Sequence, residues 1–142
     1  MTVFANVLYA VTDALALITI NRPDKLNAIS LATLDDLRAA VTVAAQDPAV
    51  RVIAITGAGD KAFASGSDLS EVLHRDLEKA LEPIVQGLAD QLERTPKPTI
   101  AAINGICMGG GLEVALGCDL RVAVTTATFA TPEGKLGIIP GG

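Results

Sequence analysis

A glycine cluster followed at once by a carboxylate, Gly109-Gly110-Gly111-Leu112-Glu113, is the stretch of this sequence best suited to chemistry. The residues at 112–116 predict a helix, so the glycines would lie at its N-terminus, where unpaired N–H groups and the helix dipole favour a negative oxygen. Glycine has no side chain to shield these groups, and Glu113 adds an acid or base in the first turn. The stretch therefore suits stabilisation of an anion beside a proton-transfer group. A strand-to-helix turn that is packed closely for steric reasons would use the same residues.

The segments around this stretch alternate between strand and helix patterns. Short apolar or alternating runs predict β-strands at residues 6–11, 14–21, 50–56, 99–104, 120–125 and 128–131. Helical spacing of apolar residues predicts helices at 31–45 and 110–116. It also predicts a helical region at 70–93, either continuous or divided at Pro83. Ser30 is the expected N-cap of the first of these helices. Strands and helices that alternate through short connections predict an α/β fold with mainly parallel strands, as a single domain over residues 1–142.

Composition argues against several classes of partner. Of 142 residues, 50% are hydrophobic and 19% charged, and the formal net charge is −5 without a basic run, so we expect no nucleic-acid partner. One histidine and two separated cysteines, Cys107 and Cys118, give neither a metal-ligand spacing nor a disulfide framework, so we expect no metal. Buried free thiols would suit a reducing cytoplasm, and the first ten residues show no export signal.

The apolar run at 99–118 has the length of a membrane-spanning helix, and its Gly105 and Gly109 form a G-x-x-x-G pattern. Asn104 and Glu113 lie inside the run, and its β-branched start is more typical of a buried strand. We therefore expect no membrane association.

Three separated segments resemble the crotonase superfamily, the enoyl-CoA hydratase/isomerase group. The segment at 21–28 (NRPDKLNA) resembles its first coenzyme A loop, 62–69 (AFASGSDL) its first oxyanion-hole loop, and 104–113 (NGICMGGGLE) its second. Pro132-Glu133 and the glycine-rich segment after it complete the order. The resemblance implies a crotonase-like (ClpP/crotonase) fold, a stacked ββα superhelix, here truncated before the C-terminal helical region.

The resemblance also implies a reaction at an acyl-CoA thioester, whose carbonyl oxygen becomes negative as an enolate forms. By motif position the backbone N–H groups of Ser67 and Gly110 would form the oxyanion hole. The family often has Ala where Ser67 stands, and this should matter little because the backbone donates. Glu113 would activate water and Glu133 would protonate the α-carbon. The pair favours an enoyl-CoA hydratase that adds water syn to a 2-enoyl-CoA.

Two alternatives to a hydratase stay open. Isomerases of the family generally keep only one carboxylate of the pair, so an enoyl-CoA isomerase is the first. Relatives are usually about twice as long, and their C-terminal region covers the acyl pocket and builds the trimer. A catalytically inactive truncated protein, which would act as a binding or assembly module, is therefore the second.

Several residues of the segments at 21–28 and 62–69 are expected to contact coenzyme A. Coenzyme A enters only as part of the substrate, and no other cofactor is implied. By resemblance these residues are Arg22, Lys25, Leu26, Ala64, Ser65, Asp68 and Leu69. Arg22 and Lys25 would meet phosphates or simply line a turn, and Asp68 would orient its loop or cap the next helix.

The apolar composition, with a mean hydropathy of +0.45, predicts a homo-oligomer. After Asp119 the only charged residues are Arg121, Glu133 and Lys135. We expect another subunit to cover the surface around residues 136–139.

Overall fold

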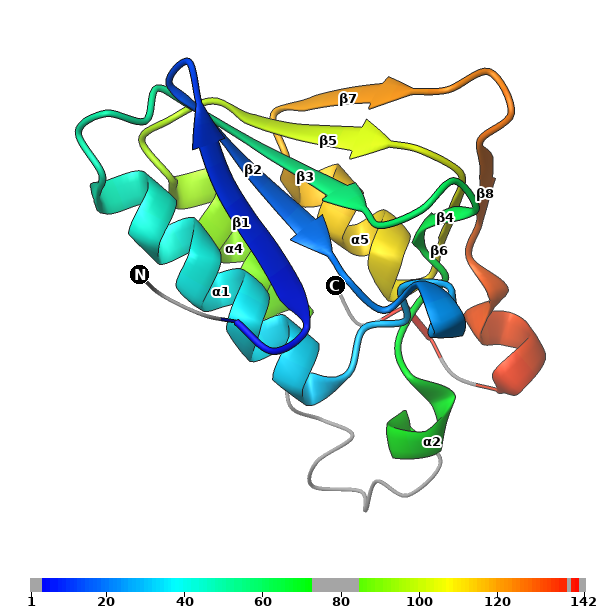
Figure 1. The fold of residues 1–142 in the computed structure, drawn as a ribbon. Helices are drawn as coiled ribbons and strands as arrows, with labels where there is room; N and C mark the ends of the chain where they lie inside the picture. Colours follow the sequence, from blue (N-terminus) through cyan, green and yellow to red (C-terminus); the bar gives the residue numbers. More distant parts are fainter. Residues whose placement is uncertain (1–3, 73–84, 138, 141–142) are drawn as a thin grey trace.

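A five-stranded sheet in the order β1-β2-β3-β5-β7 forms the body of the protein in the computed structural model (Figure 1). Its strands are Val7–Thr12 (β1), Leu15–Ile20 (β2), Val52–Gly57 (β3), Thr99–Ile103 (β5) and Leu120–Ala123 (β7). The hairpin of β1 and β2 is antiparallel, and the other neighbours pair in parallel. The structure describes residues 4–72, 85–137 and 139–140.

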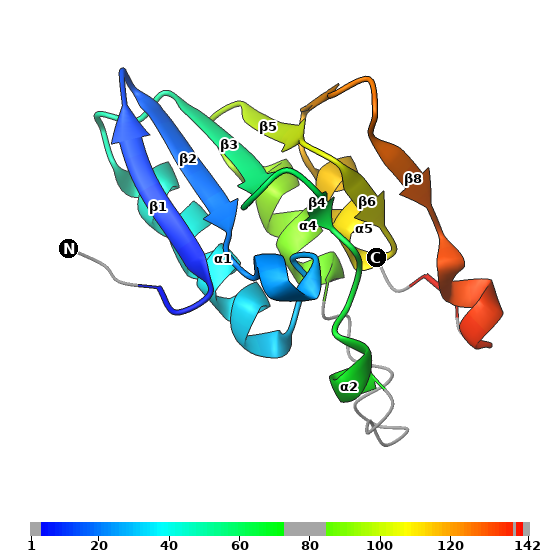
Figure 2. The same cartoon turned by 45° about the vertical axis from the view of Figure 1, so that its right-hand side comes forward.

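A second, smaller sheet is parallel throughout, with the order β4-β6-β8. Its strands are Ala62–Ala64 (β4), Ile106–Met108 (β6) and Thr128–Ala130 (β8). Figure 2 shows how the chain passes from β3 to β4, and from β5 to β6, before it turns back through a helix. The repeated strand–strand–helix units therefore stack as the predicted ββα arrangement, and the predicted fold class is confirmed.

Among the described residues, three helices cover one face of the five-stranded sheet (Figure 1). They are Leu31–Gln46 (α1), Gln86–Arg94 (α4) and Gly110–Gly117 (α5). The core lies between them and the sheet, because alternate side chains of β2, such as Ile18 and Ile20, point to the helices and are fully buried. The predicted N-cap is confirmed: Ser30 Oγ accepts the N–H of Thr33 at 3.1 Å.

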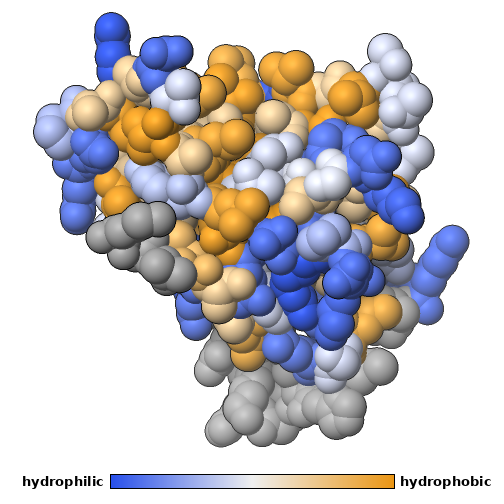
Figure 3. All heavy atoms as spheres, in the orientation of Figure 1, coloured by the Kyte–Doolittle hydropathy of each residue, from blue (hydrophilic) through white to orange (hydrophobic). Residues whose placement is uncertain are grey.

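The opposite face of this sheet carries exposed apolar side chains. Strand register places them on one side, and we call them the outer sheet face: Leu8, Leu15, Leu17, Leu120 and Val122. Figure 3 shows hydrophobic residues gathered over the upper part of this face. Parallel sheets are normally covered on both faces, so this surface is suited to further contacts.

The structure contains two short strands that the sequence analysis did not predict. They are the three-residue strands β4 and β6, and residues 62–64 were expected to be loop. Strands this short carry no readable alternation, and partners distant in the chain decide their pairing. Of the helical region predicted at 70–93, the structure describes Leu69–Val72 (α2) and α4, and residues 73–84 lie outside the described residues.

The apolar run at 99–118 forms β5, β6 and α5 rather than one helix. In the described parts of the chain, no helix has the length and apolar character needed to cross a membrane.

Candidate active site

The N-terminus of α5 begins at a backbone conformation that only glycine adopts easily. Gly109 has φ 48° and ψ −127°, which turns the chain sharply from β6 into the helix. Its N–H donates to the carbonyl of Ala130 in β8 at 3.0 Å, and its own carbonyl accepts the N–H of Glu113 at 3.0 Å. The N–H of Gly110 therefore belongs to the first turn, where no carbonyl within the helix can accept it.

The loop after β4 brings Ser67 to the same place. Ile29 donates its N–H to the carbonyl of Gly66 at 2.8 Å and accepts the N–H of Asp68 at 2.9 Å. In this parallel bridge the N–H of Ser67 points away from Ile29. An ideal Cβ on Gly110 would lie 3.5 Å from Ser67 N and 3.0 Å from Ser67 Oγ. The two predicted oxyanion donors are thus neighbours.

Glu133 lies directly against this turn. It comes from the 3₁₀ segment Pro132–Leu136 (η2) and is only 9% exposed. Its Oε1 would be 2.8 Å from an ideal Cβ on Gly109, so the carboxylate lies in close contact with this glycine. Its Oε2 is buried and has no hydrogen-bond partner among the described residues. A buried carboxylate oxygen without a protein partner is costly, and such groups are typical of functional sites.

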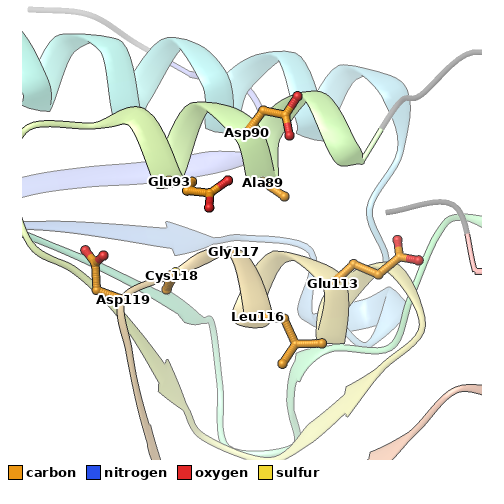
Figure 4. A pocket seen from close by; sticks show the side chains of 8 residues that line it. All are labelled: Ala89, Asp90, Glu93, Glu113, Leu116, Gly117, Cys118 and Asp119. Atoms are coloured by element: carbon orange, nitrogen blue, oxygen red, sulfur yellow. The ribbon is translucent and has the colours of Figure 1, made fainter.

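Glu113 lies on the first turn of α5, one helical turn after Gly110 on the same side of the helix. It is partly buried and lines a groove of about 380 Å³ between α4 and α5 (Figure 4). The other lining residues are Ala89, Asp90, Glu93, Leu116, Gly117, Cys118 and Asp119. In Figure 4 Glu113 lies at one end of the groove and Asp119 at the other.

Asp68 joins the predicted coenzyme A loop at 21–28 to the predicted oxyanion-hole loop at 62–69. Its Oδ2 is 2.9 Å from Nη2 of Arg22 and 3.5 Å from Nζ of Lys25. Its Oδ1 accepts both the N–H of Ser70, at 3.2 Å, and the hydroxyl of Ser70, at 2.7 Å. The carboxylate therefore caps α2 and also orients its loop, the two roles between which the sequence left a choice. Hydrogen bonds from Ser70 and then Arg22 hold the pKa of Asp68 well below its usual range.

The other predicted coenzyme A residues differ in exposure. Leu26 and Leu69 are 38% and 49% exposed, so both can meet a ligand from the loop surface. Ser65 donates its N–H to the carbonyl of Leu26 at 3.0 Å, which ties the two loops together. Ala64 is fully buried beneath α5, and its side chain is not accessible.

Two asparagines, one fully buried and one partly buried, hold the loops around the site, and sequence reasoning assigned them no role. Asn27 is fully buried and donates to the carbonyls of Ala58 and Ala62 at 2.9 and 2.7 Å. Asn104 donates to the carbonyl of Gly57 at 2.9 Å. The left-handed φ of 55° at Asn27 is typical of asparagine in turns, so the residue type was the available signal.

Comparison with known proteins gives a consistent result. Residues 10–142 match the profile of the enoyl-CoA hydratase/isomerase family. The crotonyl-CoA hydratase of Syntrophomonas wolfei is 40% identical over 140 residues, which cover 97% of this chain and 54% of that protein. The short-chain-enoyl-CoA hydratase of Clostridium acetobutylicum is 38% identical over 138 residues, which cover 96% of this chain and 53% of that protein.

Solved structures agree with these relatives. An enoyl-CoA hydratase from Bacillus anthracis superposes with a TM-score of 0.90 at 38% identity, over 96% of this chain and 54% of that one. An enoyl-CoA hydratase subunit from Geobacillus kaustophilus gives a TM-score of 0.90 at 39% identity, over 97% of this chain and 53% of that one. The chain thus spans about half the length of the proteins that it matches.

Proposed function

The chain belongs to the enoyl-CoA hydratase/isomerase family, and from that premise we propose that it binds an acyl-CoA thioester and adds water syn to a 2-enoyl-CoA. The observation that carries the proposal is the position of Glu133. Its buried carboxylate, with one oxygen unpaired among the described residues, lies against Gly109 and so beside the N-terminus of α5. A proton-transfer group next to anion-stabilising donors is what hydration of a thioester enoyl group requires.

In the proposed reaction the thioester oxygen lies between the N–H groups of Ser67 and Gly110. As the hydroxyl of water bonds to the β-carbon, negative charge moves to that oxygen, where each donor is worth about 3 kcal/mol. Glu113 takes the proton that water loses, and Glu133 gives a proton to the α-carbon. The product is a 3-hydroxyacyl-CoA.

We place coenzyme A across the two loops that Asp68 joins. Both cations pair with Asp68, Arg22 at 2.9 Å and Lys25 at 3.5 Å. Lys25 is the better candidate for a phosphate contact, because its side chain is 58% exposed, whereas that of Arg22 is 16% exposed. The exposed side chains of Leu26 and Leu69 offer apolar contacts to the remainder of the coenzyme A moiety of the substrate.

The test is loss of the conjugated enoyl absorbance of crotonyl-CoA in the presence of purified protein. Glu133→Gln and Glu113→Gln should each reduce turnover by about 10²- to 10⁴-fold. Glu93→Gln is the matched control, since Glu93 lines the groove of Figure 4 but has no part in the proposed chemistry. Turnover that survives both site substitutions would refute the assignment.

The half-length match favours a second candidate, a non-catalytic binding or assembly module. Calorimetric binding of crotonyl-CoA without turnover would select it. The isomerase alternative predicts conversion of a 3-enoyl-CoA to a 2-enoyl-CoA that depends on only one of the two glutamates.

We further propose that the protein is a cytoplasmic homo-oligomer. The outer sheet face, together with Leu116, Phe129 and Ile139, which is 86% exposed, offers apolar surface for a second subunit. Cys107 and Cys118 are buried free thiols, as suits a reducing compartment. Sedimentation equilibrium at micromolar protein tests the assembly, and a monomer would refute it.

A further inference from the structure

The ion pair between Arg22 and Asp68 has a geometry that suits positioning better than ligand binding. The two residues are 46 positions apart, and their side chains are 16% and 11% exposed. We propose that this pair is a latch that aims the N–H of Ser67 into the oxyanion hole, and that Arg22 does not bind coenzyme A. The inference rests on the proposed function for the role of Ser67.

The direction of the Ser67 N–H is set by the carbonyl of Gly66. These two groups belong to one peptide unit, which is planar and trans, so they point in opposite directions. The carbonyl of Gly66 is held by the N–H of Ile29 at 2.8 Å. The N–H of Ser67 must then point to the other side, where Gly110 lies. Whatever keeps Ile29 against this peptide therefore aims the donor.

Arg22 supplies the side-chain contacts that hold Ile29 in place. Its Nη1 donates to the carbonyl of Ala28 at 2.6 Å, immediately before Ile29, while its Nη2 reaches Asp68, immediately after Ser67. One guanidinium thus bridges the two segments that the Ile29–Ser67 backbone contact joins. A planar fork with several fixed donors is suited to such a bridge, and lysine is not.

The same contacts argue against a phosphate at Arg22. Both terminal nitrogens already donate to protein oxygens, and the Arg22 side chain is only 16% exposed. Lys25 pairs with the same carboxylate at the longer distance of 3.5 Å, and its side chain is 58% exposed. The two cations therefore have different tasks: Arg22 orients the loop and Lys25 is available to a ligand.

The test compares three neutralising substitutions, Arg22→Gln, Asp68→Asn and Lys25→Gln. For crotonyl-CoA hydration, the first two should lower kcat by about 10- to 100-fold with little change in KM, because a donor is misaimed. Lys25→Gln should raise KM and leave kcat unchanged. The double variant of Arg22 and Asp68 should lose no more of kcat than either single variant does. A raised KM with normal kcat in Arg22→Gln would overturn the proposal and assign Arg22 to coenzyme A.

Amide hydrogen exchange keeps the inference testable if the protein does not hydrate crotonyl-CoA. Arg22→Gln and Asp68→Asn should allow the contact between Ile29 and Gly66 to open more often, so the N–H of Ile29 should exchange about 10-fold faster or more. The N–H groups of β3 and β5 should keep their protection. Lys25→Gln should leave Ile29 protected. Unchanged exchange at Ile29, or equal acceleration across the sheet, would refute the latch. Arg22→Lys serves as a milder variant should the others not fold.

Discussion

Replacing Gly111 with alanine should loosen α5, the helix that carries the proposed oxyanion donor. Gly111 is buried where α5 crosses β4. An ideal Cβ there would lie 2.4 Å from the carbonyl oxygen of Ala64 and 2.7 Å from its Cβ, and real Cβ contacts under 3.0 Å are essentially never seen. The closest atom belongs to the backbone, so no side-chain rotation relieves the overlap. The helix must therefore move, by roughly 1 Å, to restore ordinary contact distances.

The size of the effect follows from two opposing terms. Overpacking a core costs about 1–3 kcal/mol, whereas alanine in place of glycine inside a helix gains about 0.5–1 kcal/mol. We expect a net loss of about 1–2 kcal/mol in the free energy of unfolding, or a fall in Tm of about 3–8 °C. Because a shift of about 1 Å in a positioned group can cost 100-fold, kcat for crotonyl-CoA should fall more than stability alone explains.

Urea unfolding followed by far-ultraviolet circular dichroism measures the change, with an unaltered m-value expected. Gly134→Ala is the matched control, because nothing lies within 4 Å of a Cβ added at Gly134. It should be neutral or stabilising by up to about 1 kcal/mol. If Gly111→Ala proved as stable and as active as the control, the reasoning on the α5–β4 contact would be wrong.

Three further predictions concern the scaffold. Ser30→Ala removes a side-chain acceptor from the first turn of α1 and should cost about 1 kcal/mol in urea unfolding, whereas no loss would deny the cap a role. Hydrogen bonds from Thr99 lower the pKa of Asp119, so its carboxylate stabilises the fold above its ordinary pKa and loses this effect as pH falls. Asp119→Asn should therefore lower Tm at pH 7, with a gap to the unaltered protein that closes below about pH 4; a gap independent of pH would contradict this. Burial raises the pKa of the Cys107 and Cys118 thiols to about 11 each, so both should resist iodoacetamide at pH 8 until the protein unfolds, and rapid labelling of the native protein would show them to be accessible.

The sequence alone determined the features that depend on neighbouring residues. The spacing of Leu34, Leu37 and Val41 and the cap at Ser30 predicted α1, because helix preferences and caps act over a few positions. The glycines at 109–111 predicted the turn into α5 for the same reason, since the backbone conformation at Gly109 excludes other residues. The alternation of strands and helices predicted an α/β fold, and the resemblance of three segments to the crotonase superfamily implied the ββα arrangement.

Only the tertiary structure decided which of these groups meet. The carboxylate of Glu133 contacts Gly109, and Arg22 forms an ion pair with Asp68. The partners in each pair are distant in the sequence. The parallel crossovers bring the segments after β2, β4, β6 and β8 together, and register between strands distant in the chain sets the final distances. The same dependence explains why β4 and β6 were missed: three residues hold too little pattern, and their partners supply the order. Pairing between distant segments is decided by the folded whole, because its free energy comes from contacts that no short window of sequence contains.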